Sequence, residues 1–155
     1  MKLYYTPGAC SLAVHITLCE TGLSFEKESV DLATKKTASG ADFSAINAKG
    51  YIPALQLDSG ELLTEGPAIN QYLADLVPEK KLAPANGSLD RVRVQSWLTF
   101  IGTELHKSFT PLFHPSSDDV KAQAKANIDK RLTYVNKELS GKSYLVGEQF
   151  SIADA

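Results

Sequence analysis

The spacing of the hydrophobic residues changes once along this chain of 155 residues. Before position 78, short apolar runs of strand length alternate with longer stretches that have helical spacing. After position 88, hydrophobic residues recur only at helical spacing. The intervening residues 78–88 contain prolines, a glycine and an asparagine among charged residues, which is typical of a linker. We therefore predict a first domain over residues 1–77, a linker over residues 78–88 and a helical domain over residues 89–155.

The first domain is expected to combine strands and helices in one particular order. Strands are predicted at residues 2–5, 25–30, 54–57 and 62–64, and helices at residues 10–21, around 43–46 and from Gly66 onward. The opening β-α-β unit favours parallel pairing of its strands, whereas the short turn at residues 58–60 makes the last two strands an antiparallel hairpin. The order β-α-β followed by β-β-α is that of the thioredoxin-like fold. We therefore predict an α/β domain of this class, followed by an all-α domain.

The helical domain is predicted to contain two long helices and the start of a third. The second helix begins at Ser117, where Asp118 and Asp119 suit the positive end of the helix dipole. Ser151 and Asp154 form a capping box, which marks the start of another helix. Because the sequence stops at Ala155, we expect that further residues follow and that the helical domain is incomplete at this end.

Four helices each carry a hydrophobic stripe that is expected to face a core. The stripes consist of Leu12, Ile16, Cys19 and Leu23; of Ile69, Tyr72, Leu73 and Leu76; of Val94, Trp97, Leu98, Ile101, Leu105, Phe109 and Leu112; and of Ala122, Ala126, Leu132, Val135 and Leu139.

Composition and charge exclude several classes of partner. The chain is 43% hydrophobic and 22% charged with a net charge of -2, so it lacks the basic excess that nucleic acids and anionic membranes require. No apolar run is long enough to span a bilayer, and the first residues do not resemble a signal peptide, so we expect a cytoplasmic protein. The three histidines and two cysteines do not have the spacing of a metal site.

Cys10 is the strongest candidate for a reactive residue. It lies at the start of a predicted helix, where backbone N–H groups and the helix dipole favour a thiolate. The helix would hold Cys10 and Cys19 about 13 Å apart, at about 1.5 Å per residue, which is too far for a disulfide. A single reactive thiol needs an external thiol to resolve its disulfide, and glutathione is the obvious candidate. The alternative is a small buried hydrophobic residue, which is how we interpret Cys19.

Two segments of the first domain combine features that suit a ligand. Pro53 stands at the start of a strand, and a cis bond there would turn the Ile52 backbone toward a ligand, whereas a trans bond would make it an ordinary strand-start proline. Gly66 and Pro67 open a helix whose N–H groups could hold a carboxylate, while Glu65 could pair with an ammonium group. Ordinary helix capping is the alternative there.

Three further features leave two interpretations open. Tyr4 and Tyr5 alternate in direction along a strand, so that one faces the core and the other could donate to a thiolate at Cys10. Lys35, in a polar loop, is either solvated or meets a ligand carboxylate. A polar line on the long helix, beside Lys107, is either a groove wall that faces a ligand or a solvated face. This line consists of Thr99, Thr103, His106 and Thr110.

Several motifs together resemble the bacterial beta-class glutathione transferases over the whole chain. They are Tyr5-x-x-Gly8-Ala9-Cys10-Ser11, Gly50-Tyr51-Ile52-Pro53-Ala54-Leu55, Leu63-Thr64-Glu65-Gly66, Ala68-Ile69-x-x-Tyr72-Leu73 and Thr103-Glu104-Leu105-His106-Lys107. The resemblance implies a homodimer with glutathione as co-substrate and no separate cofactor. At position 99, where family members often carry an asparagine that touches glutathione across the dimer, this chain has Thr99.

The resemblance also implies a role for each site residue. Cys10 would lie next to the glutathione sulfur and form a mixed disulfide with it, with His106 and Tyr5 as hydrogen-bond donors. The implied glutathione-binding residues are Ser11, Lys35 (glycyl carboxylate), Ile52 and Pro53 (cysteinyl backbone), and Glu65 and Gly66 (γ-glutamyl end). The implied second-substrate residues are Thr103, His106 and Lys107.

The expected function is therefore that of a glutathione S-transferase. It would conjugate glutathione to small hydrophobic electrophiles and reduce mixed disulfides and peroxides through Cys10. The alternative is a non-catalytic transferase-like protein that binds a partner under stress, or a carrier of hydrophobic ligands.

Overall fold

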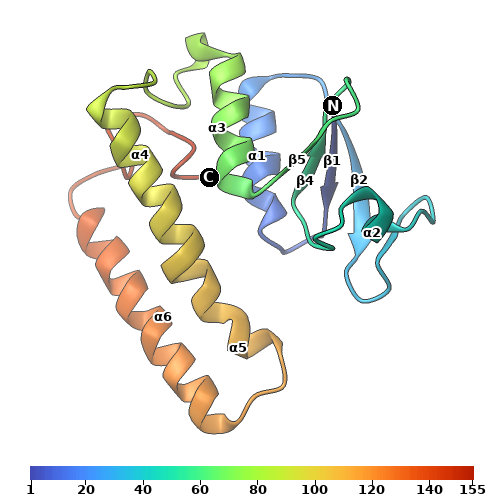
Figure 1. Ribbon diagram of the computed structural model, residues 1–155. Helices are drawn as coiled ribbons and strands as arrows, with labels where there is room; N and C mark the ends of the chain where they lie inside the picture. Colours follow the sequence, from blue (N-terminus) through green and yellow to red (C-terminus); the bar gives the residue numbers. More distant parts are fainter. The chain divides into compact units, whose positions relative to one another are not determined.

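The computed structural model describes residues 1–155. They form two compact units, one of residues 1–83 together with Ala155 and one of residues 84–154. Figure 1 shows that the first unit contains the sheet and that the second is built from helices. The predicted class, an α/β thioredoxin-like domain followed by helices, is confirmed. None of the helices combines the length and the apolar character that crossing a bilayer requires.

The first unit is built on a mixed five-stranded sheet in the order β3-β2-β1-β4-β5. Its strands are β1 (Lys2–Tyr5), β2 (Glu26–Asp31), β3 (Lys36–Thr37), β4 (Ala54–Gln56) and β5 (Leu62–Thr64). As predicted, β1 pairs parallel to β2, and β4 forms an antiparallel hairpin with β5. β1 also pairs antiparallel to β4, which places β1 at the centre of the sheet. The two-residue β3 was not predicted, because only its pairing with the end of β2 makes it a strand.

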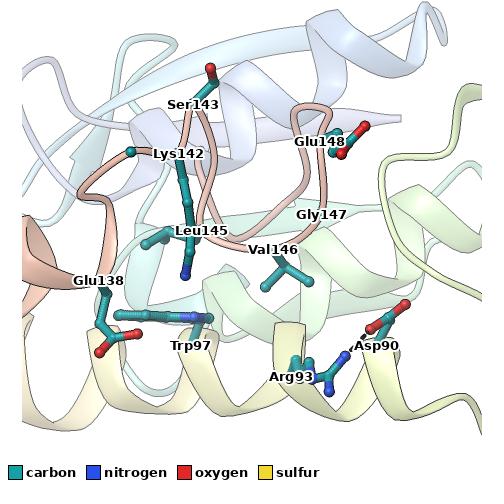
Figure 2. Close-up of a pocket in the computed structure, with 11 residues that line it drawn as sticks. Asp90, Arg93, Trp97, Glu138, Lys142, Ser143, Leu145, Val146, Gly147 and Glu148 are labelled. Atoms are coloured by element: carbon teal, nitrogen blue, oxygen red, sulfur yellow. Dashed lines mark hydrogen bonds and ion pairs between the residues drawn. The ribbon is translucent and has the colours of Figure 1, made fainter.

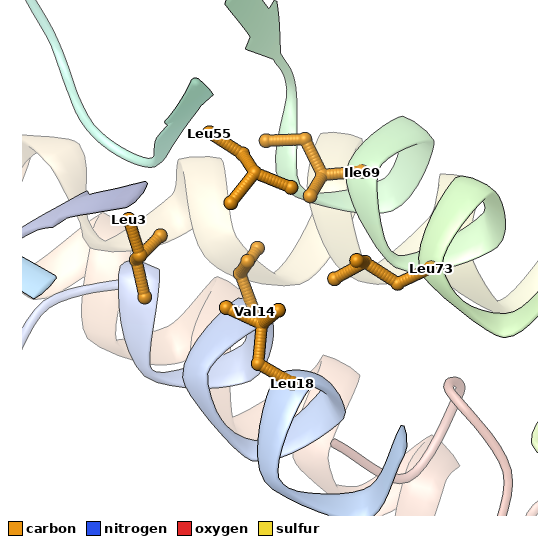
Figure 3. Packing of buried hydrophobic residues seen from close by; sticks show 6 residues of the cluster. All are labelled: Leu3, Val14, Leu18, Leu55, Ile69 and Leu73. Carbon is orange, nitrogen blue, oxygen red and sulfur yellow. The ribbon is translucent and has the colours of Figure 1, made fainter. Parts of the chain in front are cut away.

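Three helices accompany the sheet: α1 (Ser11–Thr21), α2 (Phe43–Ile46) and α3 (Gly66–Leu76). Side chains alternate along β1, so Leu3 and Tyr4 belong to different hydrophobic clusters. Leu3 packs with side chains of α1, β4 and α3 in the cluster that Figure 3 shows. Its other members are Val14, Leu18, Leu55, Ile69 and Leu73. The cluster of Tyr4 contains Val30, Phe43, Ile52 and Ala54, and it therefore reaches the segment in front of β4.

The buried side of α1 differs from the predicted stripe. Leu12 is 56% exposed and Cys19 is exposed, whereas Val14 and Leu18 are fully buried. The helix also buries three hydroxyl side chains, each of which donates to a nearby backbone carbonyl and so is buried without losing its hydrogen bond. The interpretation of Cys19 as a core residue is therefore wrong, because a stripe counted on hydrophobic residues alone selects the wrong face. The three hydroxyl residues are Ser11, Thr17 and Thr21.

The second unit begins with α4 (Leu89–Phe100), and the long helix predicted there changes its hydrogen-bonding pattern twice. A π-helical turn, η2 (Ile101–Leu105), follows α4, and a tighter 3₁₀ turn, η3 (His106–Phe109), leads into α5 (Thr110–Phe113). π turns inside helices are rare and occur frequently at functional sites. A further 3₁₀ turn, η1 (Pro78–Lys80), lies in the first unit.

The helix predicted from Ser117 is α6 (Asp118–Glu138), and its cap is confirmed because the Ser117 side chain accepts from the Val120 N–H. Its buried residues are Ala124 and Ile128, which lie on a different face of the helix from the predicted Ala122 and Ala126. Leu132 of the predicted stripe is 47% exposed. In α3, Ile69 and Leu73 are buried as predicted, but Tyr72 and Leu76 are exposed.

The predicted capping box at Ser151 has the expected contacts. The Asp154 carboxylate accepts hydrogen bonds from the Ser151 N–H and hydroxyl, both at 2.9 Å. Its other oxygen accepts from the Leu145 N–H at 2.8 Å. Asp154 therefore ties the loop that follows α6 to residues 151–154.

Candidate active site

Cys10 is the residue that precedes α1, and its thiol is exposed. Its Sγ lies 3.5 Å from the Ile52 carbonyl oxygen and donates to it. Neither Cys10 nor Cys19 is in a disulfide. Ser11 is the first residue of α1, and no backbone carbonyl of the chain accepts a hydrogen bond from its N–H. The positive end of the helix dipole and this open donor both favour a thiolate at Cys10.

The side chain of Ser11 is buried and is engaged by hydrogen bonds within the protein. Ser11 is only 1% exposed. Its hydroxyl accepts from the Thr6 N–H and donates to the Thr6 carbonyl, both at 3.2 Å. The side chain therefore closes the turn between β1 and α1, and only the backbone N–H of Ser11 is left for ligand binding.

The peptide bond between Ile52 and Pro53 is cis. Ile52 is 5% exposed, and its N–H donates to no backbone carbonyl of the chain. A Cβ added to Gly66 would lie 3.6 Å from the Pro53 ring and 3.9 Å from Val14. The start of α3 therefore lies beside Pro53, so that Cys10, the segment before β4 and the start of α3 converge in the first unit.

Lys35 lies in the loop between β2 and β3 and has a positive φ of 57°. Its ammonium donates to the Gly50 carbonyl at 2.8 Å, and the residue is half-buried. This contact fixes a positive charge two residues before Ile52. A cation in this position suits a carboxylate at one end of a ligand bound along the Ile52 backbone.

Glu65 precedes α3 and has a positive φ of 68°, which is unusual for a residue other than glycine. Its side chain does not cap the helix. Instead, Oε1 accepts a hydrogen bond from the Tyr51 hydroxyl at 2.7 Å and from the Lys49 ammonium at 2.8 Å. The Gly66 N–H donates to no backbone carbonyl of the chain. A carboxylate and an open N–H therefore lie next to each other, as recognition of an α-amino acid end requires.

Lys49 and Tyr51 are neighbours of Glu65 that were not predicted as candidate site residues. The pKa of Lys49 is raised above its ordinary value, chiefly because its ammonium donates to Glu65. The pKa of Tyr51 is also raised, again chiefly by the hydrogen bond to Glu65. Asn47 shapes this loop, because its side chain donates to the Tyr51 carbonyl at 2.8 Å and accepts from the Lys49 N–H at 3.1 Å. The only sequence signal was a cation and a phenol immediately before Ile52-Pro53.

The two tyrosines of β1 have separate environments. Tyr4 is buried, and its hydroxyl donates to Gln56 at 3.2 Å. The Tyr5 ring packs on the core that includes Leu3, with its centroid 6.3 Å from that of His15 and 5.8 Å from the Lys27 ammonium. Tyr4 is therefore a packing residue, and Tyr5 is the tyrosine left for the predicted donor role.

The predicted polar line of the helical unit is exposed along its length. The Thr103 hydroxyl donates to the Thr99 carbonyl at 2.9 Å, and the Thr99 hydroxyl donates to the Gln95 carbonyl at 2.8 Å. His106 and Lys107 are exposed in η3, directly after the π turn. His106 is thus the first residue after the π turn, a kind of helical irregularity that is frequent at functional sites.

A separate cavity of about 850 Å³ lies in the helical unit between α4 and the segment after α6. Figure 2 shows Trp97 on one wall, with Lys142 reaching toward it from the opposite segment. Asp90 and Arg93, also on the α4 wall, form an ion pair at 2.6 Å. None of the predicted site residues lines this cavity, so it is not the predicted site. The structure also contains no group of three or more histidine, cysteine or acidic side chains that could hold a metal ion.

Comparison with known proteins places both parts of the chain in one family. Residues 8–76 match the N-terminal domain of glutathione S-transferases, and residues 100–155 match their C-terminal domain. The chain is 51% identical over 156 residues to the glutathione S-transferase GstA of Escherichia coli O157:H7, and the match covers all of this chain and 78% of GstA.

Two solved structures have nearly the same backbone. A sphingomonad glutathione S-transferase complexed with glutathione is 54% identical with a TM-score of 0.95, and the match covers 99% of this chain and 77% of that one. The bacterial beta-class glutathione S-transferase of Sphingomonas chungbukensis is 51% identical with a TM-score of 0.95 and the same coverage of 99% and 77%. The resemblance drawn from the sequence motifs is therefore confirmed over the whole chain.

Proposed function

This chain belongs to the glutathione S-transferase family and resembles its bacterial beta class, and from this we propose that it is an enzyme that conjugates glutathione to small hydrophobic electrophiles. The same site would reduce glutathione mixed disulfides through Cys10. A non-catalytic partner-binding protein or a ligand carrier is not favoured, because neither function requires an exposed thiol at a helix start beside an open backbone N–H.

The observation that carries this proposal is the position of the Cys10 thiol against the Ile52 backbone. Sγ lies 3.5 Å from the Ile52 carbonyl, and the Ile52 N–H has no carbonyl partner in the chain. An extended peptide pairs with such an open backbone as an added strand does. A cysteinyl residue paired with Ile52 would bring its sulfur next to Cys10.

The charged groups on either side of Ile52 suit the two ends of glutathione. Lys35 offers a cation held at the Gly50 carbonyl, which would meet the glycyl carboxylate. Glu65 and the Gly66 N–H would bind the γ-glutamyl end, which carries both an ammonium and a carboxylate group. The protein would therefore place the cation of Lys35 at one end of bound glutathione and the carboxylate of Glu65 at the other.

Conjugation requires a glutathione thiolate, which the Ser11 N–H and the dipole of α1 would stabilise. We assign His106 and Tyr5 as further donors to the sulfur, and His106, Lys107 and Thr103 as the wall of the second-substrate cleft. These roles and a homodimeric assembly rest on the family resemblance, whereas domain limits at residues 1–77 and 89–155 and a cytoplasmic location rest on the patterns of the sequence.

Thiol reduction would use Cys10 itself, in two balanced steps. The Cys10 thiolate attacks the glutathione sulfur of a mixed disulfide, so that a Cys10–glutathione disulfide forms and the other thiolate leaves. A second glutathione thiolate then attacks this disulfide and releases oxidised glutathione, which restores the Cys10 thiolate. Conjugation does not need this covalent step, so the two activities should separate in a Cys10 variant.

The test is turnover of glutathione with an activated aryl chloride, together with glutathione-dependent reduction of a small mixed disulfide. We expect Cys10→Ala to abolish the reduction and to retain part of the conjugation, and His106→Ala to slow the conjugation. Cys19→Ala is the matched control, because Cys19 is an exposed thiol on the same helix. Absence of both activities in the wild-type protein, or full activity in Cys10→Ala, His106→Ala and the double variant, would contradict the proposal.

A further inference from the structure

An ion pair lies where the γ-glutamyl end of glutathione would bind. The Lys49 ammonium is 2.8 Å from Glu65 Oε1, the carboxylate proposed to bind the ligand's ammonium. Both side chains are about half exposed, at 47% and 55%. The carboxylate proposed to bind the ligand's ammonium therefore already contacts an ammonium of the protein.

Breaking the ion pair between Lys49 and Glu65 should require little free energy. Ion pairs between exposed side chains contribute little to stability, because water screens their attraction. Lys49 also has two other partners nearby: it donates to the Thr64 hydroxyl at 3.0 Å, and it lies over the Tyr51 ring at 5.9 Å from the centroid. The ammonium can therefore leave Glu65 and remain close to the site.

Glu65, by contrast, is held in place. Its backbone has an unusual positive φ, its carbonyl accepts from the Ala68 and Ile69 N–H groups of α3, and its carboxylate accepts from the Tyr51 hydroxyl. Asn47 in turn fixes the Tyr51 backbone. When the Lys49 contact is exchanged, the Tyr51 contact can persist and keep the carboxylate oriented.

We propose that Lys49 is a specificity residue that binds the α-carboxylate of the γ-glutamyl group while Glu65 binds its α-ammonium. This inference rests on the proposed function. One ion pair within the protein is replaced by two ion pairs with the ligand, so that charge is balanced before and after binding. In an α-amino acid the ammonium and the carboxylate are attached to the same carbon. Lys49 and Glu65, which would bind these two groups, are likewise next to each other in the site.

The proposal gives Lys49 an effect that depends on one group of the ligand. Two analogues of glutathione isolate this effect. In 4-aminobutanoyl-cysteinyl-glycine the α-carboxylate is missing and the ammonium remains, whereas in glutaryl-cysteinyl-glycine the ammonium is missing and a carboxylate remains. If Lys49 only positions Glu65, its loss should weaken the two ligands that carry the ammonium alike and leave the glutaryl analogue unaffected. If Lys49 binds the α-carboxylate, its loss should weaken the two ligands that carry this carboxylate, glutathione and the glutaryl analogue.

The experiment measures dissociation constants of the three ligands by calorimetry for wild type, Lys49→Met, Lys49→Arg and Lys80→Met. We expect Lys49→Met to weaken glutathione about three- to fivefold and not to weaken the 4-aminobutanoyl analogue. Lys49→Arg should retain most of the affinity, because it keeps the charge. Lys80→Met is the matched control, because it removes an exposed cation of the same unit outside the site. Thermal unfolding of each variant shows that it is folded.

Each other result would overturn the proposal in a recognisable way. Equal or tighter binding of glutathione to Lys49→Met would mean that Lys49 only competes with the ligand. Equal weakening of glutathione and the 4-aminobutanoyl analogue would mean that Lys49 only positions Glu65. Failure of the wild-type protein to bind glutathione would instead contradict the proposed function, and this inference with it.

Discussion

The two helices that begin at the candidate site begin in opposite ways. At the start of α1, Cys10 already has helical backbone angles, with φ -58° and ψ -15°, and the buried Ser11 hydroxyl closes the preceding turn. At the start of α3, Glu65 has φ 68° and ψ 105°, and no side chain caps the helix. The start of α1 is held by hydrogen bonds of the Ser11 side chain to Thr6. At the start of α3, the Glu65 side chain instead makes contacts outside the helix.

The two helix starts therefore use their polar side chains differently. In α1 a serine holds the backbone, so the cysteine before it is left exposed for chemistry. In α3 a side-chain cap would contribute about 1 kcal/mol, yet the Glu65 carboxylate is directed to Tyr51 and Lys49 instead. If Glu65 binds glutathione as proposed, substitutions at Ser11 should act on stability and substitutions at Glu65 on ligand binding.

The largest expected effect concerns the thiol at the start of α1. In wild-type protein incubated with oxidised glutathione, intact mass should show a gain of one glutathione that a reductant reverses. Cys10→Ser should abolish this adduct, because a hydroxyl is not ionised at neutral pH and cannot exchange with a disulfide. Cys19→Ser should form the adduct as wild type does. An adduct that persists in Cys10→Ser and disappears in Cys19→Ser would show that Cys19 is the reactive thiol, and it would contradict the role proposed for Cys10.

The next effect concerns the internal hydrogen bonds of the same helix start. Ser11→Ala should lower the free energy of unfolding by about 1–3 kcal/mol, because it leaves the Thr6 N–H and carbonyl without their side-chain partner. Urea unfolding measures this loss. Ser24→Ala is the control, since Ser24 is an exposed serine in the loop after α1. If both alanine variants are equally stable, the Ser11 hydroxyl does not hold the turn.

The parts of the fold that were predicted correctly depend on local signals. Gly22 marks the end of α1, Gly66-Pro67 marks the start of α3, and Ser117 marks the cap of α6, because each of these residues acts on the backbone next to it. The hairpin of β4 and β5 follows from its short turn. Local chemistry of this kind is present in the sequence before any tertiary contact forms.

The parts that were missed depend on contacts between distant residues. The buried face of α1 includes hydroxyl residues whose hydrogen bonds to carbonyls are visible only in the folded helix. The bond between Lys49 and Glu65 joins residues 16 positions apart, and no periodicity predicts it. For the same reason, the motif resemblance implied a ligand-binding role for Glu65 but could not show that Lys49 contacts the same carboxylate.

The smallest expected effect tests the conformation of Glu65 at the start of α3. Glycine adopts a positive φ readily, whereas alanine does not, so Glu65→Gly should be more stable than Glu65→Ala by about 1 kcal/mol. Both variants lose the contacts to Lys49 and Tyr51, so these contacts cancel in the comparison. Urea unfolding of the two variants gives the difference.

Both Glu65 variants should weaken glutathione about tenfold and to the same extent, because both lose a charge-assisted hydrogen bond to the ligand's ammonium. Glu61→Gly is the control, because Glu61 is an exposed glutamate in the same unit whose φ is not positive. It should leave glutathione binding unchanged and should not gain stability. If Glu65→Gly is no more stable than Glu65→Ala, the unusual backbone at Glu65 carries no strain. The contrast between the two helix starts would then lie in their side chains alone.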